Sequence, residues 1–128
     1  MDKVKAECVP NWYGAVVLYF PGSVPIECLE AALSCYLTAN TYHDIADTVE
    51  IIYQEVESLR SWDVSDILAA LFAKCDLKNI SAATARFNGS ILIDLSFHHY
   101  EKYPSLLFNG EHMKTIHMLG ADLSIDPY

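Results

Sequence analysis

Apart from Leu92, residues 90–98 (SILIDLSFH) alternate between apolar and polar side chains, and this alternation is the strongest constraint on the fold. Successive side chains of a β-strand point to opposite faces, so a period of two indicates a strand with one buried face. Asn88-Gly89, the pair favoured in two-residue turns, separates this run from the extended run 80–87. We therefore predict a β-hairpin over 80–98 with Asp94 and Ser96 pointing outward and a core face made of Ile80, Ala82, Ile91, Ile93, Leu95 and Phe97.

The first half of the chain carries one strand pattern followed by helical patterns. Residues 13–20 (YGAVVLYF) predict a mostly buried strand that is closed by a Pro-Gly pair. Apolar residues three or four apart predict a helix over about 25–38, a second over 44–59 and a third that begins at Asp63 or Ser65. Residues 48–56 are rich in β-branched side chains, so a strand remains an alternative there.

The last part of the sequence predicts a helix and an edge strand. Asn109 is suited to cap the helix and Gly120 to end it, because glycine readily adopts a left-handed conformation. Residues 123–126 then form a short strand that lies at an edge, since Pro127 cannot donate a ladder hydrogen bond.

Together the segments predict one α+β domain over residues 1–128, in the order β-α-α-α-β-β-α-β, with an antiparallel sheet packed against helices. The length of 128 residues suits one domain, and a hydrophobic content of 52% can fill its core. No stretch approaches the roughly 18 apolar residues of a membrane span. The N-terminus lacks the pattern of a secretory signal, so we expect a cytoplasmic protein.

The net charge of −9 is unevenly distributed and limits the possible partners. Between Lys5 and Arg60 the chain contains no lysine or arginine, while acidic residues are frequent. Nucleic acids and anionic membranes are bound through cations, so neither is expected as a partner. A basic protein would be attracted, whereas the alternative is that the acidity only keeps the protein soluble.

Signatures of catalysis or metal binding are missing from the sequence. The histidines, His43, His98, His99, His112 and His117, lack the spacing of paired zinc or iron ligands. Nucleophile-elbow and nucleotide-binding glycine motifs are also absent. We therefore predict no catalytic residue, no metal and no cofactor. Several aromatic residues can serve either an interface or the core: Tyr36, Tyr42, Tyr53, Trp62, Tyr100 and Tyr103.

The segment YPSLLFNGEHMKTIHMLGADLSIDPY resembles the C-terminal part of the bacterial domain-of-unknown-function family 4279. The resemblance covers the chain from Trp62 onward and is carried by Pro104–Leu107, Leu119-Gly120-Ala121 and Asp126-Pro127-Tyr128. It implies a small immunity protein of the kind encoded beside polymorphic and contact-dependent toxins, and it supplies no catalytic residue.

These observations predict an immunity protein that neutralises a cognate toxin by occlusion, for example a basic nuclease. A small ligand-binding protein or enzyme with a pocket between sheet and helices is the first alternative, and a structural or regulatory homo-oligomer is the second. The predicted partner-binding residues are Glu27, Glu30, Asp44, Asp47, Glu50, Glu55 and Glu57.

Overall fold

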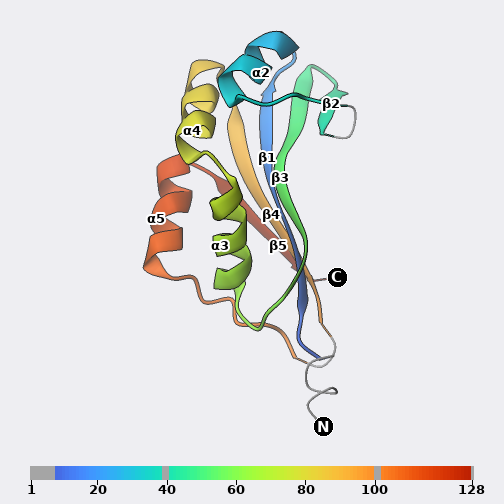
Figure 1. Cartoon of the computed structure of the whole chain (residues 1–128), viewed down its shortest axis with the longest axis vertical. Helices are drawn as coiled ribbons and strands as arrows, with labels where there is room; N and C mark the ends of the chain where they lie inside the picture. The colour runs from blue at the N-terminus through green and yellow to red at the C-terminus, as the bar shows by residue number, and fades with distance from the viewer. Residues whose placement is uncertain (1–7, 39–40, 100–101, 128) are drawn as a thin grey trace.

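The computed structural model describes residues 8–38, 41–99 and 102–127 (Figure 1). Within these ranges it contains one five-stranded sheet and four helices. The strands are β1 Asn11–Pro21, β2 Tyr42–Ile45, β3 Thr48–Arg60, β4 Ser90–His98 and β5 Asp122–Pro127. The helices are α2 Ile26–Leu33, α3 Val64–Lys74, α4 Leu77–Arg86 and α5 Gly110–Leu119.

The sheet has the strand order β2-β3-β1-β4-β5, so the first strand lies at its centre. β1 pairs antiparallel with both β3 and β4, and β2 pairs antiparallel with β3. β5 is parallel to β4 because the chain crosses over through α5 between them. The predicted α+β class is therefore confirmed, but the sheet is mixed where an antiparallel one was expected. The element order is also corrected, to β-α-β-β-α-α-β-α-β.

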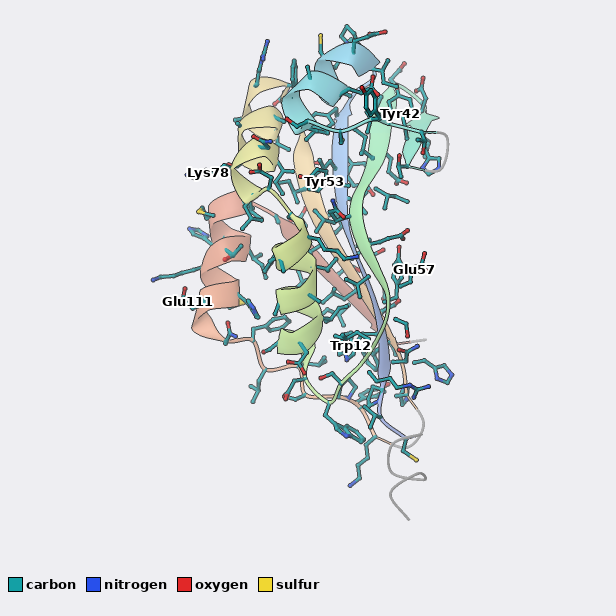
Figure 2. The ribbon with its side chains drawn as sticks, viewed as in Figure 1. Trp12, Tyr42, Tyr53, Glu57, Lys78 and Glu111 are labelled. Atoms are coloured by element: carbon teal, nitrogen blue, oxygen red, sulfur yellow. The ribbon has the colours of Figure 1, made fainter. Side chains whose placement is uncertain are left out.

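All four helices cover the same side of the sheet (Figure 1). The core lies between these layers and includes Trp12, Leu18 and Phe20 of β1, none of which is more than 1% exposed. Trp12 and Tyr53 point toward the helices in Figure 2, whereas Glu57 points away from them. α3 packs closely on β1 at Gly14, where a side-chain carbon would lie 2.8 Å from Leu71 Cδ1. The glycine thus permits this close approach of helix and sheet.

The predicted helix over 44–59 is wrong, and the segment forms the hairpin β2–β3 instead. Its turn is Ala46-Asp47, with φ angles of 43° and 64°, flanked by the paired residues Ile45 and Thr48. Two positive φ angles are the signature of a type I′ turn, which suits the twist of a hairpin. The β-branched residues of this segment pack in strand β3, where Val49 and Ile51 are fully buried.

The predicted hairpin over 80–98 is wrong in its first half. Residues 77–86 form α4, which Asp76 caps by accepting a hydrogen bond from Asn79 N–H at 3.1 Å. Asn88 has a positive φ of 57°, but it ends this helix, and Gly89 N–H donates to the Thr84 carbonyl at 2.8 Å. The expected core face holds for Ile80 and for the four β4 residues assigned to it, Ile91, Ile93, Leu95 and Phe97, but Ala82 is exposed.

The other predicted elements are confirmed with adjusted limits. The strand at 13–20 is β1, the third predicted helix is α3, and the helix predicted over 25–38 ends at Leu33. Asn109 caps α5 by accepting from His112 N–H at 2.8 Å, and Gly120 ends it with a φ of 62°. β5 lies at the sheet edge as predicted. No helix in the described ranges is long and apolar enough to cross a membrane. Tyr100 and Tyr128 lie outside the described residues.

Candidate functional site: the open face of the sheet

One face of the sheet is not covered by any of the described helices, and we call it the open face (Figure 1). Its side chains follow from the strand register, because paired residues on neighbouring strands point to the same side. Core residues of β1 are Trp12, Gly14, Val16, Leu18 and Phe20, so the residues between them belong to the open face. The open face comprises Tyr13, Ala15, Val17, Tyr19, His43, Glu50, Ile52, Glu55, Glu57, Leu92, Asp94, Ser96, His98, Asp122, Ser124 and Asp126.

The centre of the open face is apolar. Val17 of β1 is paired with Ile52 of β3 and with Leu92 of β4, which places three aliphatic side chains in one row. Val17 is 7% exposed and the neighbouring Ala15 is 2% exposed. Since the described helices lie on the other side, side chains of the open face itself must cover these two residues. Ile52 and Leu92 are only half-buried, so part of the apolar row stays accessible.

Two tyrosines flank the apolar row and interact with carboxylates. Tyr13 Oη donates a hydrogen bond to Glu55 Oε2 at 3.0 Å. Burial, followed by this hydrogen bond and the neighbouring negative charges, raises the pKa of Tyr13 to about 12. Tyr19 is paired with Glu50, and burial together with the charge of Glu50 raises the pKa of its phenol as well. Both phenols therefore remain protonated at neutral pH and can act as hydrogen-bond donors.

Six carboxylates lie on the open face, from the three strands β3, β4 and β5: Glu50, Glu55, Glu57, Asp94, Asp122 and Asp126. No lysine or arginine of the described residues lies within ion-pair distance of any of them. Partial burial and then the charge of Asp126 raise the pKa of Asp94. Both causes act against the ionised form, because the carboxylate is partly withdrawn from water and lies near a second negative charge.

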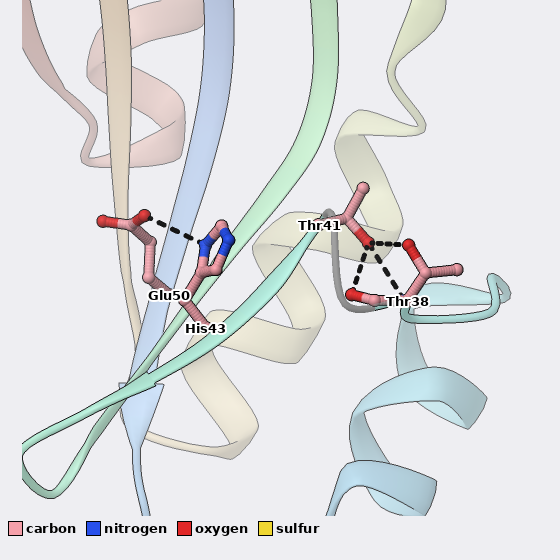
Figure 3. Close-up of polar contacts among 4 residues, drawn as sticks. All are labelled: Thr38, Thr41, His43 and Glu50. Atoms are coloured by element: carbon pink, nitrogen blue, oxygen red, sulfur yellow. Dashed lines mark hydrogen bonds and ion pairs between the residues drawn. The ribbon is translucent and has the colours of Figure 1, made fainter.

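Among the described residues, the basic side chains of the open face, His43, His98 and Arg60, lie at its ends. His43 Nδ1 lies 3.5 Å from Glu50 Oε1 at the β2 edge, as Figure 3 shows. In the same figure Thr41 Oγ1, just before β2, accepts a hydrogen bond from Thr38 N–H and lies close to the Thr38 hydroxyl. Arg60 shares a register position with Asn11 at the opposite end, and its guanidinium donates to the Val9 carbonyl at 3.4 Å. Lys74, Lys78, Arg86 and Lys114 belong to the helices.

A shallow hollow of about 470 Å³ lies at the Arg60 end of the open face. It is lined by Asn11, Trp12, Tyr13, Glu57, Ser96 and His98. Glu57 and His98 therefore meet at one depression, but it lies on the open face, whereas the ligand-binding alternative expected a pocket between sheet and helices. The Glu57 side chain is exposed. Such an open, wet site suits contact with a partner surface better than enclosure of a small molecule.

The predicted binding residues do not all lie on one surface. The structure brings together Glu50, Glu55 and Glu57 on the open face. Glu27 and Glu30 lie on α2, where Glu30 accepts a hydrogen bond from Leu37 N–H at 2.9 Å. Asp44 points to the side opposite His43 on β2, and Asp47 occupies the β2–β3 turn. The seven predicted binding residues are therefore distributed over α2, β2, the β2–β3 turn and the open face.

Several open-face residues were missed as binding residues. The outward direction of Asp94 was predicted from the alternation of β4, and its burial pattern confirms this direction. Tyr13, Tyr19, Asp122 and Asp126 were not assigned to the surface, although they too alternate with core residues along their strands. The contacts of Tyr13 with Glu55 and of Tyr19 with Glu50 depend on the order of the strands, which a single sequence does not specify.

Groups capable of metal or nucleophilic chemistry are sparse. In residues 8–38, 41–99 and 102–127 no three histidine, cysteine or acidic side chains are grouped so that they could hold a metal ion. Burial raises the pKa of the Cys75 thiol to about 11, so its reactive thiolate is scarce at neutral pH. The absence of metal and cofactor remains a prediction that elemental analysis of the purified protein would test.

The fold and this face together define a one-sided α+β scaffold that presents an acidic, tyrosine-containing sheet surface. Comparisons of the chain with protein-family models, with curated proteins and with solved structures find no significant match in any of the three.

Proposed function

We propose that this chain is an immunity-type binding protein that neutralises a basic toxin by covering it with the open face. The observation that carries the proposal is the collection of six carboxylates on one uncovered sheet face, with no lysine or arginine in ion-pair distance within the described residues. Uncompensated charge of one sign attracts and orients a partner of the opposite sign. The resemblance of the C-terminal half to immunity proteins points the same way.

The centre of the open face supplies the apolar and aromatic contacts that a stable interface needs in addition to charge. Stable interfaces combine a desolvated apolar or aromatic centre with a polar rim. On this face Ile52 and Leu92 form an accessible apolar row, and Tyr13 and Tyr19 stand on either side of it. The carboxylates surround this centre on the three strands β3, β4 and β5. The arrangement supports a protein partner more than a purely solubilising role for the acids.

A small-ligand site at the Glu57–His98 hollow is the second candidate, because a carboxylate and an imidazole line the same depression. Glu57→Gln separates the two candidates. It removes one of several charges from a protein interface and should weaken toxin binding only slightly. A ligand held in the hollow through Glu57 would instead be largely lost.

The proposal predicts that a secreted toxin is encoded beside the gene, and it is tested by co-expression of the protein with that toxin. Glu57→Lys/Asp122→Lys reverses two exposed charges of the open face, and both residues lie at the surface, so the variant should fold. Glu27→Lys/Glu111→Lys makes the same charge change on helices α2 and α5 and serves as the matched control. We expect the first variant to lose protection of the cells and the control to retain it.

Circular dichroism of both variants verifies that each is folded. Equal protection by the two folded variants would contradict the proposal, because the acidity would then serve solubility and the toxin-facing surface would lie elsewhere. Loss of protection by the control alone would assign the partner to the helical side.

A further inference from the structure

We infer that residues 53–60, at the free edge of β3, pair with the same residues of a second copy, so that the protein forms a two-fold symmetric dimer with one continuous sheet. The inference goes beyond the proposed function and does not depend on it. It rests on an edge that lacks a neighbouring strand and on side chains along this edge that complement their own copy.

Most of the outer edge of β3 has no partner strand. β2 is paired with β3 only over Thr48–Ile51, and Ile52 N–H then donates to the Thr41 carbonyl at 2.8 Å. Beyond this point no strand of the described residues lies beside β3 on the side away from β1. The backbone N–H and C=O groups of 53–60 that point away from β1 are therefore available to an added strand.

The side chains of this edge are divided between the two faces of the sheet. Glu55 and Arg60 lie on the open face, whereas Val56 and Leu59 lie on the core face, as their partners in β1 show. The bulge Glu57-Ser58 separates the two core-face residues, because two residues of β3 stand there opposite one residue of β1. Both bulge residues belong to the open face, where one lines the hollow and the other bonds to the Asn11 side chain.

Among the antiparallel registers that pair most of this edge with itself, one keeps both faces matched. It is centred between the two bulge residues, and it places Glu55 opposite Arg60 of the second copy and Val56 opposite Leu59 of the second copy. Each pair occurs twice because of the two-fold symmetry. The bulge of one copy lies opposite the bulge of the other, so the pairing between the copies is regular.

Opposite charges meet in this register. Arg60 lies directly opposite Glu55 and diagonally opposite Glu57 of the second copy, and both positions are within reach of a long side chain on a sheet. None of these three residues takes part in an ion pair in the described part of the chain. Glu55 uses one carboxylate oxygen to accept from Tyr13, and Lys74 bonds its backbone carbonyl instead of its carboxylate. Arg60 is also the only lysine or arginine of the described strands.

The core side of the edge is apolar. Val56 and Leu59 pack against the core but are only half-buried, and a paired strand would cover their remaining exposed surface. The two-fold axis of this register is perpendicular to the sheet. The open faces of the two copies therefore lie side by side and stay uncovered.

The opposite edge of the sheet lacks such complementarity. An antiparallel pairing of β5 with its own copy, centred on Ser124, would place Asp122 opposite Asp126. Like charges directly opposite each other destabilise a strand pair, and Pro127 cannot donate a ladder hydrogen bond. The edge of β3 is therefore the one that fits a second copy.

Sedimentation velocity of the full-length protein tests the association from about 1 μM to about 500 μM, the range in which small interfaces associate. We expect the dimer fraction to rise with concentration and to fall when salt is added, because its ion pairs are exposed. Hydrogen exchange followed by mass spectrometry should show slower exchange of the amides of 53–60 at the high concentration.

A charge exchange assigns the dimer to this register. Arg60→Glu and Glu55→Arg should each weaken dimerisation at least about ten-fold, because like charges then face each other. An equimolar mixture of the two variants should dimerise again, since each variant supplies the charge that the other lacks at both contacts. Lys78→Glu makes the same charge change as Arg60→Glu on the exposed side of α4 and should dimerise as the wild type does.

Three results would overturn the inference. The first is a wild-type protein that stays monomeric at about 500 μM. The second is a dimer that persists in Arg60→Glu or that leaves the exchange of 53–60 unchanged, because the contact would then lie elsewhere. The third is a mixture of the two variants that stays monomeric although circular dichroism shows both to be folded. Toxin neutralisation is tested separately by co-expression, so these results leave the proposed function untouched.

Discussion

Gly14→Ala should destabilise the protein because this position sets the distance between α3 and β1. A methyl carbon at Gly14 would lie 2.8 Å from Leu71 Cδ1, 3.0 Å from Ile67 Cγ1 and 3.1 Å from Leu95 Cδ2. Carbon atoms in contact are normally about 3.5–4.0 Å apart. All three neighbours are fully buried, so they cannot move aside without disturbing the core.

The size of the effect follows from two opposing contributions. Overpacking a filled core costs about 1–3 kcal/mol. Replacing glycine in a strand recovers about 0.5–1 kcal/mol, because the unfolded chain loses less entropy on folding. We therefore expect Gly14→Ala to lower the free energy of unfolding by about 1–2 kcal/mol and Tm by roughly 4–8 °C. Gly14→Val, which adds two further methyl groups at the same place, should cost more.

Urea unfolding followed by tryptophan fluorescence measures this change, since Trp12 is buried two residues away. Gly110→Ala is the matched control, because Gly110 is exposed in the first turn of α5 and nothing lies within 4 Å of an added carbon. The control should be neutral or slightly stabilising. A Gly14→Val protein as stable as the control would refute the close packing of α3 on β1.

Three further measurements test individual interactions. Asn109→Ala removes the side-chain cap of α5 and should cost about 1 kcal/mol in the free energy of unfolding, measured by urea denaturation. The pKa of Tyr13 is about 12 in the folded protein and 10.0 when unperturbed, so folding favours the protonated phenol. The stability that the protonated phenol contributes should be fully present below pH 10 and lost as the pH rises toward 12. Tyr13→Phe should lack this loss when unfolding is compared from pH 9 to 12. The raised pKa of Asp94 means that its ionised form destabilises the fold, so Asp94→Asn should raise Tm at pH 7, and this gain should shrink as the pH falls to 3. An unchanged Tm at pH 7 would contradict the partial burial of that carboxylate.

The sequence predicted strands well where a continuous apolar run or an alternating pattern marks them. β1 and β4 lie where expected, and the buried residues of β4 are those that the period of two selects. The two caps of α5 were also predicted from the sequence, because Asn109 and Gly120 act through local backbone geometry that does not depend on the rest of the fold. These features are encoded within a few residues of one another.

The failures have identifiable physical causes. In 44–59 the apolar residues fit both a helical stripe and a bulged strand, and β3 contains register irregularities opposite Trp12–Gly14 and Val16–Val17 that disturb a simple alternation. The real turn, Ala46-Asp47, lacks the asparagine-glycine signal, whereas Asn88-Gly89 has that signal and ends a helix. Hairpin turns and helix ends both use a residue in the left-handed region, so an Asn-Gly pair alone does not show which of the two structures it forms.

The candidate site was only partly predictable for a different reason. Glu50, Glu55 and Glu57 were selected by their charge, but Asp94 and Asp126 join them only through the pairing of β1 with β4 and of β4 with β5. Such pairings connect distant parts of the chain. They are decided by tertiary packing, which a single sequence does not display.

The central position of β1 also determines when the chain can fold during synthesis. Asn11 is paired with Arg60 on one side and with His98 on the other, so the strand made first waits for partners that are made much later. Until residues 90–98 have left the ribosome, one edge of β1 has no hydrogen-bonded partner strand. The apolar residues of β1 can then form non-native contacts or aggregate. Nascent chains arrested before residue 90 should therefore be protease-sensitive and chaperone-bound, and resistance should arise only after β4 has emerged.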